Sequence, residues 1–344
     1  MLYVTTRTNE PCTVAHPLNE NLGPDGGFFA PMHLPVYTRQ QIQDLGKRAF
    51  SANVAEVVNL LFGTSLDSWA VEFAIGRYPV KFANVGNRTL IAETWHNPAW
   101  NFERLARGIE KAVRQSDQIC PVPTDWLMIG SRMAVLFGIF GELIGKKAVS
   151  PDAPIDLVIP TGDFSGPISG YYCKKMGLPI QNVLCCCNDN AAAWSLIHKG
   201  EMRTDSNLIP TQTPNCDHAI PAGLERLVYE TLGRGEVAKF LECVKSGTTY
   251  YLEPHQLSEL RNGLYAAVVS KRQFESAVTS LYGSYGYLAD PYGALCVAGI
   301  GAYRSKTGIS CTALVLSEES PVHHLPLLAQ ILGSTVAKLK ETID

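Results

Sequence analysis

The sequence predicts an α/β fold with a mainly parallel, twisted sheet. From Thr89 onward, short apolar segments of strand length alternate with longer helical patterns, which is typical of a parallel sheet covered by helices on both faces. The clearest unit runs from residue 155 to residue 187 as strand, helix and strand, and such a crossover joins parallel neighbours. The 344 residues are 46% hydrophobic, so the chain can bury a large core.

The first part of the chain has a different texture. A turn rich in glycine and proline occupies residues 23–27, and apolar periodicity predicts helices over residues 38–45 and 54–61. We therefore expect an N-terminal domain formed by residues 1–90, which caps a large α/β domain formed by residues 91–344.

The strand–helix–strand unit begins with the apolar segment Ile155–Pro160. Residues 161–166 form a loop, and Pro167 then opens a helix, because a proline at the first helical position lacks only an N–H that would have no partner there. The helix ends near Gly177, and residues 178–187 form the next strand. The loop therefore follows the C-terminal end of a strand, where open α/β sheets place their ligands.

Charge and hydropathy exclude several classes of partner. Charged residues make up 18% of the chain and the net charge is -3, so no basic surface for nucleic acid or an anionic membrane is predicted. The first ten residues lack the apolar core of a signal peptide, and the longest apolar run, residues 133–141, is shorter than the roughly 20 residues that span a bilayer. This run belongs to a core helix over residues 125–147 with Asp125 as its N-cap. We expect a cytoplasmic protein whose partner is a small molecule or another protein.

The cysteines and histidines predict no metal site. The ten cysteines contain no C-x-x-C pair, and Cys185, Cys186 and Cys187 lie in a predicted strand, where adjacent side chains point to opposite faces. We expect free thiols in a reducing compartment. His323 and His324 are adjacent, and adjacent residues seldom converge on one ion, so a solvated pair is expected.

The loop after the first strand of the unit has the layout of a phosphate site. A glycine-containing loop between a strand and a helix N-terminus presents backbone N–H groups to an anion. Asp163 argues against this use, because its carboxylate would repel a phosphate. The residues of this loop are Thr161, Gly162, Asp163, Phe164, Ser165 and Gly166.

Five segments resemble, in the same order, motifs of the threonine synthase family. They are G-P-D-G-G-F-F-A-P at residues 23–31 (family G-x-D-G-G-L-F-V-P), I-P-T-G-D-F at 159–164 (V-P-S-G-N-F), C-D-H-A-I-P-A-G-L-E-R-L at 216–227 (M-D-I-x-V-P-S-N-x-E-R-L), Y-L-A-D-P-Y-G-A at 287–294 (D-P-H-x-A) and L-S-E-E-S-P at 316–321 (L-S-T-A-x-P). The resemblance implies a tryptophan-synthase-β-like fold of the enzymes that use pyridoxal phosphate (PLP). It implies a cofactor phosphate at residues 161–166, a cofactor ring near Ser317 and Glu318, and a lyase of amino-acid metabolism that acts on O-phosphohomoserine.

Two departures from the family concern its chemistry. Residues 95–103 read W-H-N-P-A-W-N-F-E where the family reads F-H-G-P-T-x-A-F-K, so His96 keeps its place but Glu103 stands at the lysine that binds PLP. A carboxylate does not form an imine, so we expect no covalent PLP. The family's S-G-D-T-G loop is absent, and the short interval between Phe102 and Ile155 implies a truncated small domain.

Three functions follow from these departures. The first is a degenerate homologue, a pseudoenzyme without PLP catalysis. The second is a PLP-dependent lyase of the threonine synthase type with a relocated lysine, for which Lys111 is the candidate. The third is an enzyme that uses Glu103 as an acid or base without PLP. We expect Glu103, Asp163 and Glu318 to meet in one acidic cavity, unless they pair with arginines such as Arg104 and Arg132.

Overall fold

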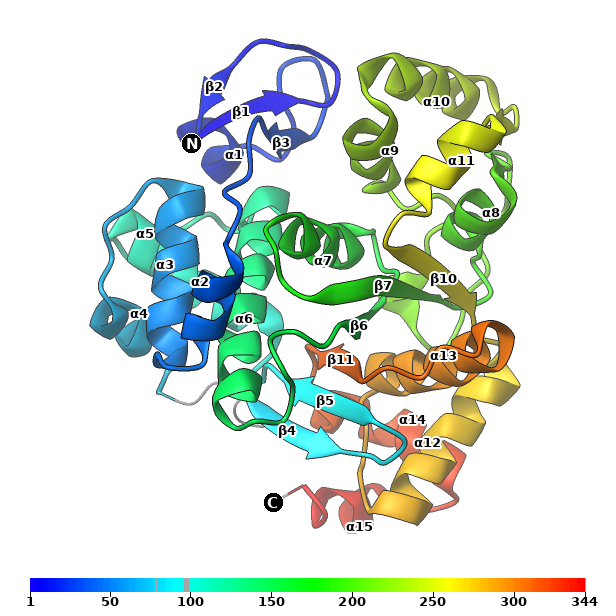
Figure 1. Cartoon of the computed structure of the whole chain (residues 1–344). Coiled ribbons are helices and arrows are strands. Elements are labelled where there is room, and N and C mark those ends of the chain that lie inside the picture. Colours follow the sequence, from blue (N-terminus) through cyan, green and yellow to red (C-terminus); the bar gives the residue numbers. More distant parts are fainter. Residues whose placement is uncertain (78–79, 96–98, 344) are drawn as a thin grey trace.

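A six-stranded sheet forms the centre of the protein in a computed structural model that describes residues 1–77, 80–95 and 99–343 (Figure 1). The strand order is β10-β7-β6-β11-β5-β4, and every neighbouring pair is parallel except β4 and β5. The predicted α/β fold with a mainly parallel sheet is therefore confirmed. In this order the strands span Leu264–Val268, Ile180–Cys187, Ile155–Pro160, Ala313–Ser317, Thr89–Glu93 and Lys81–Asn84.

Helices cover both faces of this sheet, as the alternation of side chains along β6 demonstrates. Leu157 and Ile159 belong to one hydrophobic core and Val158 to the other. The first core is shared with α6 (Asp125–Gly145) and α7 (Ser165–Lys175), and the second with α12 (Lys271–Tyr285), α13 (Pro291–Thr307) and α14 (Leu325–Leu332).

The N-terminal part packs on α6. Its elements are a small sheet of β1 (Leu2–Thr5), β2 (Cys12–Thr13) and β3 (Phe29–Pro31), and the helices α1 (Ala15–Asn19), α2 (Arg39–Leu45), α3 (Phe50–Phe62) and α4 (Ser68–Ile75). Helix α3 approaches α6 closely: a Cβ at Gly138 would lie 2.6 Å from the Phe50 ring, and one at Gly141 would collide with Asn53. The predicted boundary at residue 90 falls within β5, so the hairpin β4–β5 carries the chain into the large sheet.

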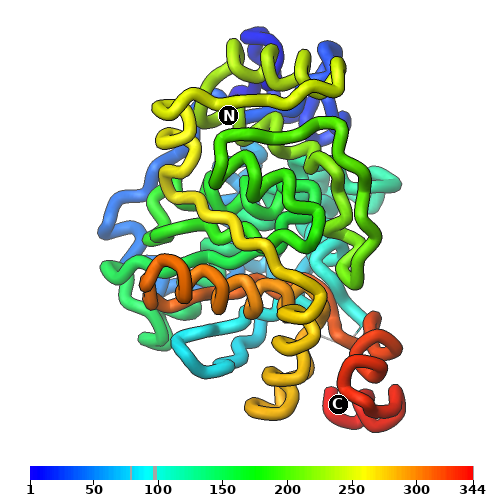
Figure 2. The backbone as a smooth tube through the Cα atoms, turned by 90° about the vertical axis from the view of Figure 1, so that its right-hand side faces the viewer, coloured from blue at the N-terminus to red at the C-terminus, as the bar shows by residue number. Residues whose placement is uncertain are grey.

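The remaining elements fall into two main groups along the chain, one between β7 and α12 and one after β11. The first group comprises α8 (Ala192–Lys199), β8 (Glu201–Met202), the 3-10 turn η1 (Pro214–Cys216), α9 (Leu224–Leu232), α10 (Arg234–Ser246), β9 (Tyr250–Tyr251) and α11 (Pro254–Leu260). The second comprises η2 (Pro321–His324), α14 and α15 (Val336–Lys340), and α5 (Phe102–Arg114) follows β5. The two termini lie at opposite ends of the molecule (Figure 2).

Three predicted boundaries were wrong. Helix α6 begins at Asp125 and ends at Gly145, but its N-cap is Thr124, whose hydroxyl accepts the N–H of Leu127 at 3.3 Å, because the Asp125 carboxylate is used by Arg226 at 2.5 Å. Helix α7 begins two residues before Pro167, at Ser165. The proline is still tolerated, because the N–H groups of the first helical turn have no carbonyl partners within the helix. Strand β7 begins at Ile180 rather than at residue 178.

Helix α6 is the central helix of the protein. It has 21 residues and is apolar enough to cross a membrane by length and composition. In its most apolar window, however, 83% of the residues are buried inside the protein. Its apolar character is therefore explained by packing against other elements, as predicted for a core helix.

Candidate functional site

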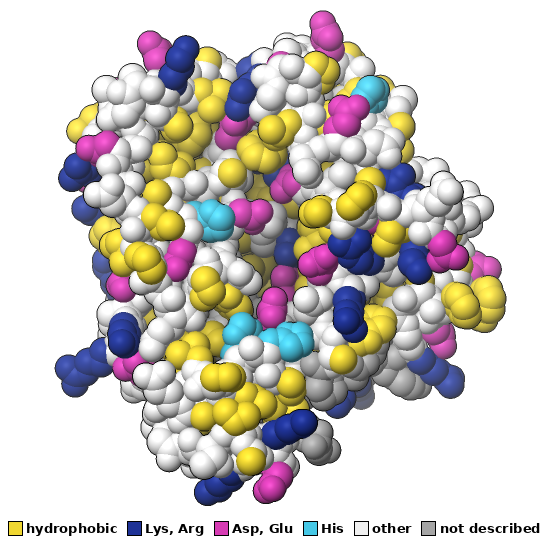
Figure 3. Space-filling view, turned by 180° about the vertical axis from the view of Figure 1, so that it is seen from behind, with side chains coloured by type: hydrophobic (Ala, Val, Ile, Leu, Met, Phe, Trp, Pro, Cys, Tyr) yellow, Lys and Arg dark blue, Asp and Glu magenta, His cyan; other side chains and the backbone are white. Residues whose placement is uncertain are grey.

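A cavity of about 420 Å³ lies at the C-terminal ends of β6 and β11. In the sheet, β6 lies between β7, which follows it in the chain, and β11, which comes from a distant part of the sequence. The strand order therefore reverses between β6 and β11. Seen from behind, the molecule is hollowed at its centre, and acidic and histidine side chains gather around the hollow (Figure 3). The residues that line the cavity are Asn101, Phe102, Glu103, Met128, Arg132, Ile159, Pro160, Thr161, Gly162, Asp163, Ser165, Gly166, Asn215, Cys216, His218, Tyr292, Leu316, Glu318 and Glu319.

The loop between β6 and α7 forms one wall. It makes a tight turn in which Gly162 and Phe164 have positive φ angles of 49° and 78°, and the Phe164 N–H donates to the Thr161 carbonyl at 2.9 Å. The Asp163 carbonyl accepts the N–H of Gly223 at 2.8 Å, and only a glycine fits there, because a Cβ would lie 2.8 Å from that same oxygen. The backbone of the loop is therefore held from outside, by the segment before α9.

The Asp163 side chain is turned onto the first turn of α7. Its Oδ1 accepts the backbone N–H of Ser165 at 2.9 Å and the Ser165 hydroxyl at 2.6 Å. These two groups are donors that a phosphate-binding loop offers to its ligand. In this protein a carboxylate of the loop itself accepts them.

Arg132 and Glu318 pair in the same wall. The Arg132 Nη2 donates to Glu318 Oε2 at 2.8 Å and its Nε donates to Oε1. Arg132 is 5% exposed and lies over the Phe102 ring at 4.6 Å. Burial opposes its charge, but the carboxylate of Glu318, together with those of Asp163 and Asp125, outweighs this effect and raises the pKa of Arg132. Arg132 Nη1 has no acceptor within the described part of the chain.

Glu103 reaches the cavity because α5 is tied to the end of β11. The Phe102 N–H donates to the Glu318 carbonyl at 2.9 Å, and Asn101 caps α5 by accepting the Arg104 N–H. The Glu103 carboxylate pairs with Arg107, whose Nη2 lies 2.8 Å from Oε1, and its side chain is 50% exposed. Two of the three predicted carboxylates, Glu103 and Glu318, therefore both line the cavity and bind arginines.

The structure places the other predicted site residues as follows. Thr161, Gly162, Ser165 and Gly166 line the cavity. Phe164 does not, because its ring is fully buried in the core. Ser317 does not either, because its hydroxyl points inward, donating to Asp290 Oδ2 at 2.7 Å and accepting the Trp95 indole N–H. His96 lies outside the described residues.

Sequence reasoning missed Glu319, which lies beside the two histidines that were expected to be a solvated pair. One Glu319 oxygen lies 3.5 Å from a ring nitrogen of His323 and 3.5 Å from one of His324, and the two nearby histidines, His324 most of all, lower the pKa of Glu319. The two histidines therefore contact a carboxylate and are not simply solvated. The signal in the sequence that could have indicated this contact was the acidic pair Glu318-Glu319, which ends four residues before His323. Within residues 1–77, 80–95 and 99–343, no group of three His, Cys, Asp or Glu side chains is placed to hold a metal ion.

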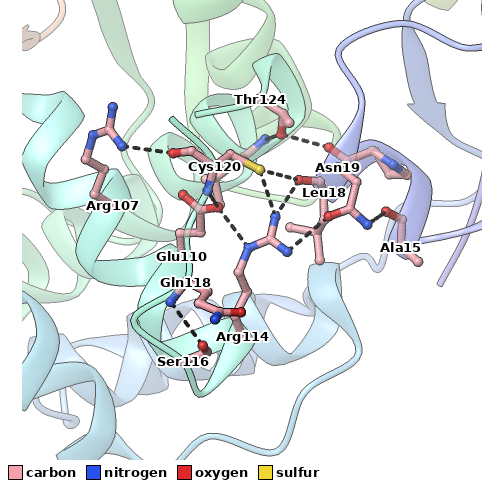
Figure 4. A network of polar contacts seen from close by, with 12 residues as sticks. Ala15, Leu18, Asn19, Arg107, Glu110, Arg114, Ser116, Gln118, Cys120 and Thr124 are labelled. Carbon is pink, nitrogen blue, oxygen red and sulfur yellow. Dashed lines mark hydrogen bonds and ion pairs between the residues drawn. The ribbon is translucent and has the colours of Figure 1, made fainter. Parts of the chain in front are cut away.

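A short, firmly held loop joins α5 to α6 beside the cavity (Figure 4). The buried Glu110 carboxylate accepts the N–H of Cys120 at 3.0 Å and pairs with Arg114 at 2.8 Å. Arg107, the partner of Glu103, also donates to the carbonyls of Cys120 and Pro121. The interval between Phe102 and Ile155, where a truncated small domain was expected, thus contains α5, this loop and α6, and three charged side chains of α5 hold the loop.

Searches of known proteins found similarity to threonine synthases. No family model matches the chain. Mouse threonine synthase-like 1 is 26% identical over 205 residues, which cover 58% of this chain and 27% of that protein. The threonine synthase of Pseudomonas aeruginosa is 27% identical over 179 residues, which cover 50% of this chain and 37% of that protein. The match thus spans about a quarter to a third of the length of these relatives.

Solved threonine synthases share the fold. The PLP-bound threonine synthase of Brucella melitensis superposes with a TM-score of 0.83 at 19% identity, over 97% of this chain and 91% of that one. The yeast threonine synthase superposes with a TM-score of 0.81 at 16% identity, over 96% and 90% of the two chains. The chain is therefore similar in sequence to threonine synthases over part of its length, and it shares the α/β fold of the solved threonine synthases.

Proposed function

We propose that this threonine synthase-like protein does not perform PLP catalysis and that its cavity binds a small molecule without a covalent bond. The observation that carries the proposal is the composition of the cavity wall: none of the described residues that line it is a lysine. Glu103, which the resemblance aligns with the lysine that binds PLP, lies in this wall. An imine with an aldehyde cofactor requires an amine, which a carboxylate does not supply.

The residues present do not fit PLP in other respects. The phosphate of the cofactor would need the free donors at the start of α7, and the Asp163 carboxylate accepts both the N–H and the hydroxyl of Ser165. Arg132, the one arginine or lysine among the described lining residues, already pairs with Glu318 through Nε and Nη2, which leaves only its Nη1 without an acceptor among the described residues. We therefore derive no reaction step through this cofactor.

A relocated lysine receives no support from the geometry. Lys111 lies on the same helix as Glu103 but eight residues further on, which is about 12 Å along the axis. It is exposed, pairs with Asp117 at 3.0 Å, and is not among the described residues that line the cavity. These contacts favour a structural role for Lys111 on the surface.

Acid–base catalysis by Glu103 is also less favoured. A carboxylate that works as a base near neutral pH is usually desolvated or placed beside another negative group. Glu103 is half exposed and accepts two hydrogen bonds from Arg107, at 2.8 and 3.1 Å. Glu103 is therefore placed as a solvated, ion-paired side chain and not as a desolvated one.

The purified protein tests this proposal directly. We expect no absorbance of an internal aldimine after incubation with PLP, no pyridoxyl adduct after reduction with borohydride, and no threonine from O-phosphohomoserine. The Pseudomonas aeruginosa threonine synthase, treated in parallel, is the positive control. A reduced adduct mapped to any lysine of this chain, or growth of a threonine auxotroph supported by it alone, would overturn the proposal.

We further propose a cytoplasmic setting with a small-molecule ligand or a protein partner. All ten cysteines are free, and several of them are buried, which suits a reducing compartment. Fractionation of cells that express the chain from its own gene would test the location.

A further inference from the structure

A second hollow lies at the opposite edge of the central sheet, where β5 and β11 begin. It has a volume of about 660 Å³ and is lined by the turn between β4 and β5, by α12, by the C-terminal half of α13 and by Ser310 in the loop before β11. The turn lies beside α12 (Figure 1), so closely that a Cβ at Gly86 would collide with the Tyr285 hydroxyl. We call this hollow the arginine groove, because Arg88 and Arg304 line it.

The groove carries positive charge that no carboxylate of its own lining balances. None of the described residues that line it is acidic, and within the described part of the chain both arginines bind carbonyls rather than carboxylates. Arg304 donates to the carbonyls of Asn87 and Cys311 at 2.5 and 2.9 Å, which ties the end of α13 to the turn. Arg88 is exposed, and its one acceptor among the described residues is the Ser310 carbonyl at 3.1 Å.

Nearby negative groups reduce this charge but do not cancel it. The Arg304 charge acts on the buried Asp156 carboxylate, which does not line the groove and accepts the thiol of Cys311 at 2.9 Å. The helices α12 and α13 both end at this edge, and each helix end contributes about half a negative charge. Lys306, in the last turn of α13, adds a further positive charge. The balance at this edge therefore remains positive.

Apolar side chains form the floor of the groove. Val85, Leu281 and Ile300 line it and belong to the second hydrophobic core. Gly301 keeps the groove open, because a Cβ at this position would meet no atom within 4 Å. This glycine lies inside α13, where nearly any other residue would favour the helix more. The groove thus combines an apolar floor, free space and a cationic rim.

We propose that the arginine groove binds a medium-chain fatty acid or a similar small amphipathic carboxylate. The apolar chain lies on Val85, Leu281 and Ile300, and the carboxylate lies beside Arg88, whose planar guanidinium matches the geometry of a carboxylate. The volume of about 660 Å³ falls within the range of small-molecule pockets. This site is separate from the cavity at the C-terminal end of β11, so the inference does not depend on the proposed function.

Octanoate is the probe for the purified wild-type protein, with binding measured by calorimetry. From hexanoate to octanoate, affinity should rise by up to about fourfold for each CH₂ group that enters the groove. Octanol has the same chain length without the charge, and we expect it to bind about threefold more weakly than octanoate, the size of effect that an exposed charge pair provides.

Two positions test the location of the ligand. Gly301→Leu fills the groove without a backbone clash and should lower octanoate affinity at least about tenfold, the effect of losing two buried CH₂ groups. Gly283→Leu is the matched control: Gly283 lies in α12 and also has open space around its Cβ, but it does not line the groove, so affinity should stay at the wild-type value.

Arg88 tests the charge independently, should Gly301→Leu fail to fold by circular dichroism. Arg88→Gln should weaken octanoate binding about threefold and leave octanol binding unchanged, whereas Arg88→Lys keeps the charge and should retain most of the affinity.

Three results would overturn the inference: no octanoate binding to wild type up to the solubility limit, equal octanoate affinity of Gly301→Leu and Gly283→Leu, or octanol binding as tight as that of octanoate. A short peptide with apolar C-terminal residues that binds the groove when octanoate does not would assign it to a protein partner, which also contradicts the inference. The experiments with PLP and O-phosphohomoserine concern the first cavity, so the two sets of outcomes remain distinguishable.

Discussion

Arg132 and Glu318 meet at two points in the cavity wall, with the Nε and Nη2 donors of the guanidinium on the two oxygens of the carboxylate. Arg132 comes from α6 and Glu318 follows β11, so the contact joins positions that are 186 residues apart in the chain. The guanidinium is almost fully buried, whereas the Glu318 side chain retains 24% exposure. The pair thus holds the central helix to the end of a central strand.

Removing the charge of Glu318 should destabilise the protein. Glu318→Gln leaves the buried Arg132 charge without its counter-ion, and we expect the free energy of unfolding to fall by about 3 kcal/mol, the low end for buried pairs because Glu318 is partly solvated. Urea denaturation measures the change. The control is Glu103→Gln, which breaks a half-exposed pair and should cost less than about 1 kcal/mol. Equal losses in the two variants would contradict this account.

The pH dependence of stability should reveal the buried Asp290. Burial raises the pKa of Asp290 above its usual value near 3.8, so this group contributes most to stability below that pH and loses the contribution as pH rises through the raised pKa. Asp290→Asn keeps an acceptor for the N–H groups of Tyr292 and Gly293 and does not titrate. Relative to Asp290→Asn, wild type should become less stable as pH rises from 4. A difference that is constant with pH would refute the assignment.

Loss of the Asp125 carboxylate should destabilise the protein more than loss of the Thr124 hydroxyl that caps α6. Thr124→Ala removes the N-cap hydroxyl and should cost about 1 kcal/mol. Asp125→Ala leaves Arg226, which is fully buried, without its carboxylate, and should cost about 3 kcal/mol. Thermal and urea unfolding of the two variants give the order. A larger loss for Thr124→Ala would mean that Arg226 is satisfied by other groups.

Restoring an amine at position 103 should not restore catalysis. Glu103→Lys supplies the group that forms an imine, but Asp163 still occupies the Ser165 donors, and the segment between α5 and α6 remains a short fixed loop. We expect no threonine from O-phosphohomoserine in an end-point assay with excess PLP. Measurable turnover by this single variant would show that the amine was the one missing group.

The fold was largely predictable because its signals are local. The apolar strand Ile155–Pro160, the following loop and the buried strand that carries Cys185 were each recognisable from a few consecutive residues. The start of α7 was misjudged because Pro167 gave a strong local signal. The helix begins earlier, after Phe164, and the Ser165 N–H donates to the Asp163 side chain, whose direction a sequence does not reveal.

The candidate site was less predictable because its contacts are long-range. The resemblance pointed to Glu103, Asp163 and Glu318, and all three line one cavity. No spacing rule, however, indicates that Arg132 rather than Arg104 would pair with Glu318, since the pair depends on how α6 packs against β11. Glu319 was overlooked for the same reason, because its two histidine partners belong to the turn η2.

The glycines on α6 make this helix dependent on the helices of the N-terminal part. Gly138 and Gly141 leave room on this helix for the Phe50 and Asn53 side chains of α3 and for the Leu45 carbonyl of α2. An α/β part translated without these helices would expose the apolar face of α6 to water and would be prone to aggregation. The large domain therefore depends on these helices to cover α6. A substitution such as Gly138→Ala would require a smaller residue at position 50, because the new Cβ would collide with the Phe50 ring.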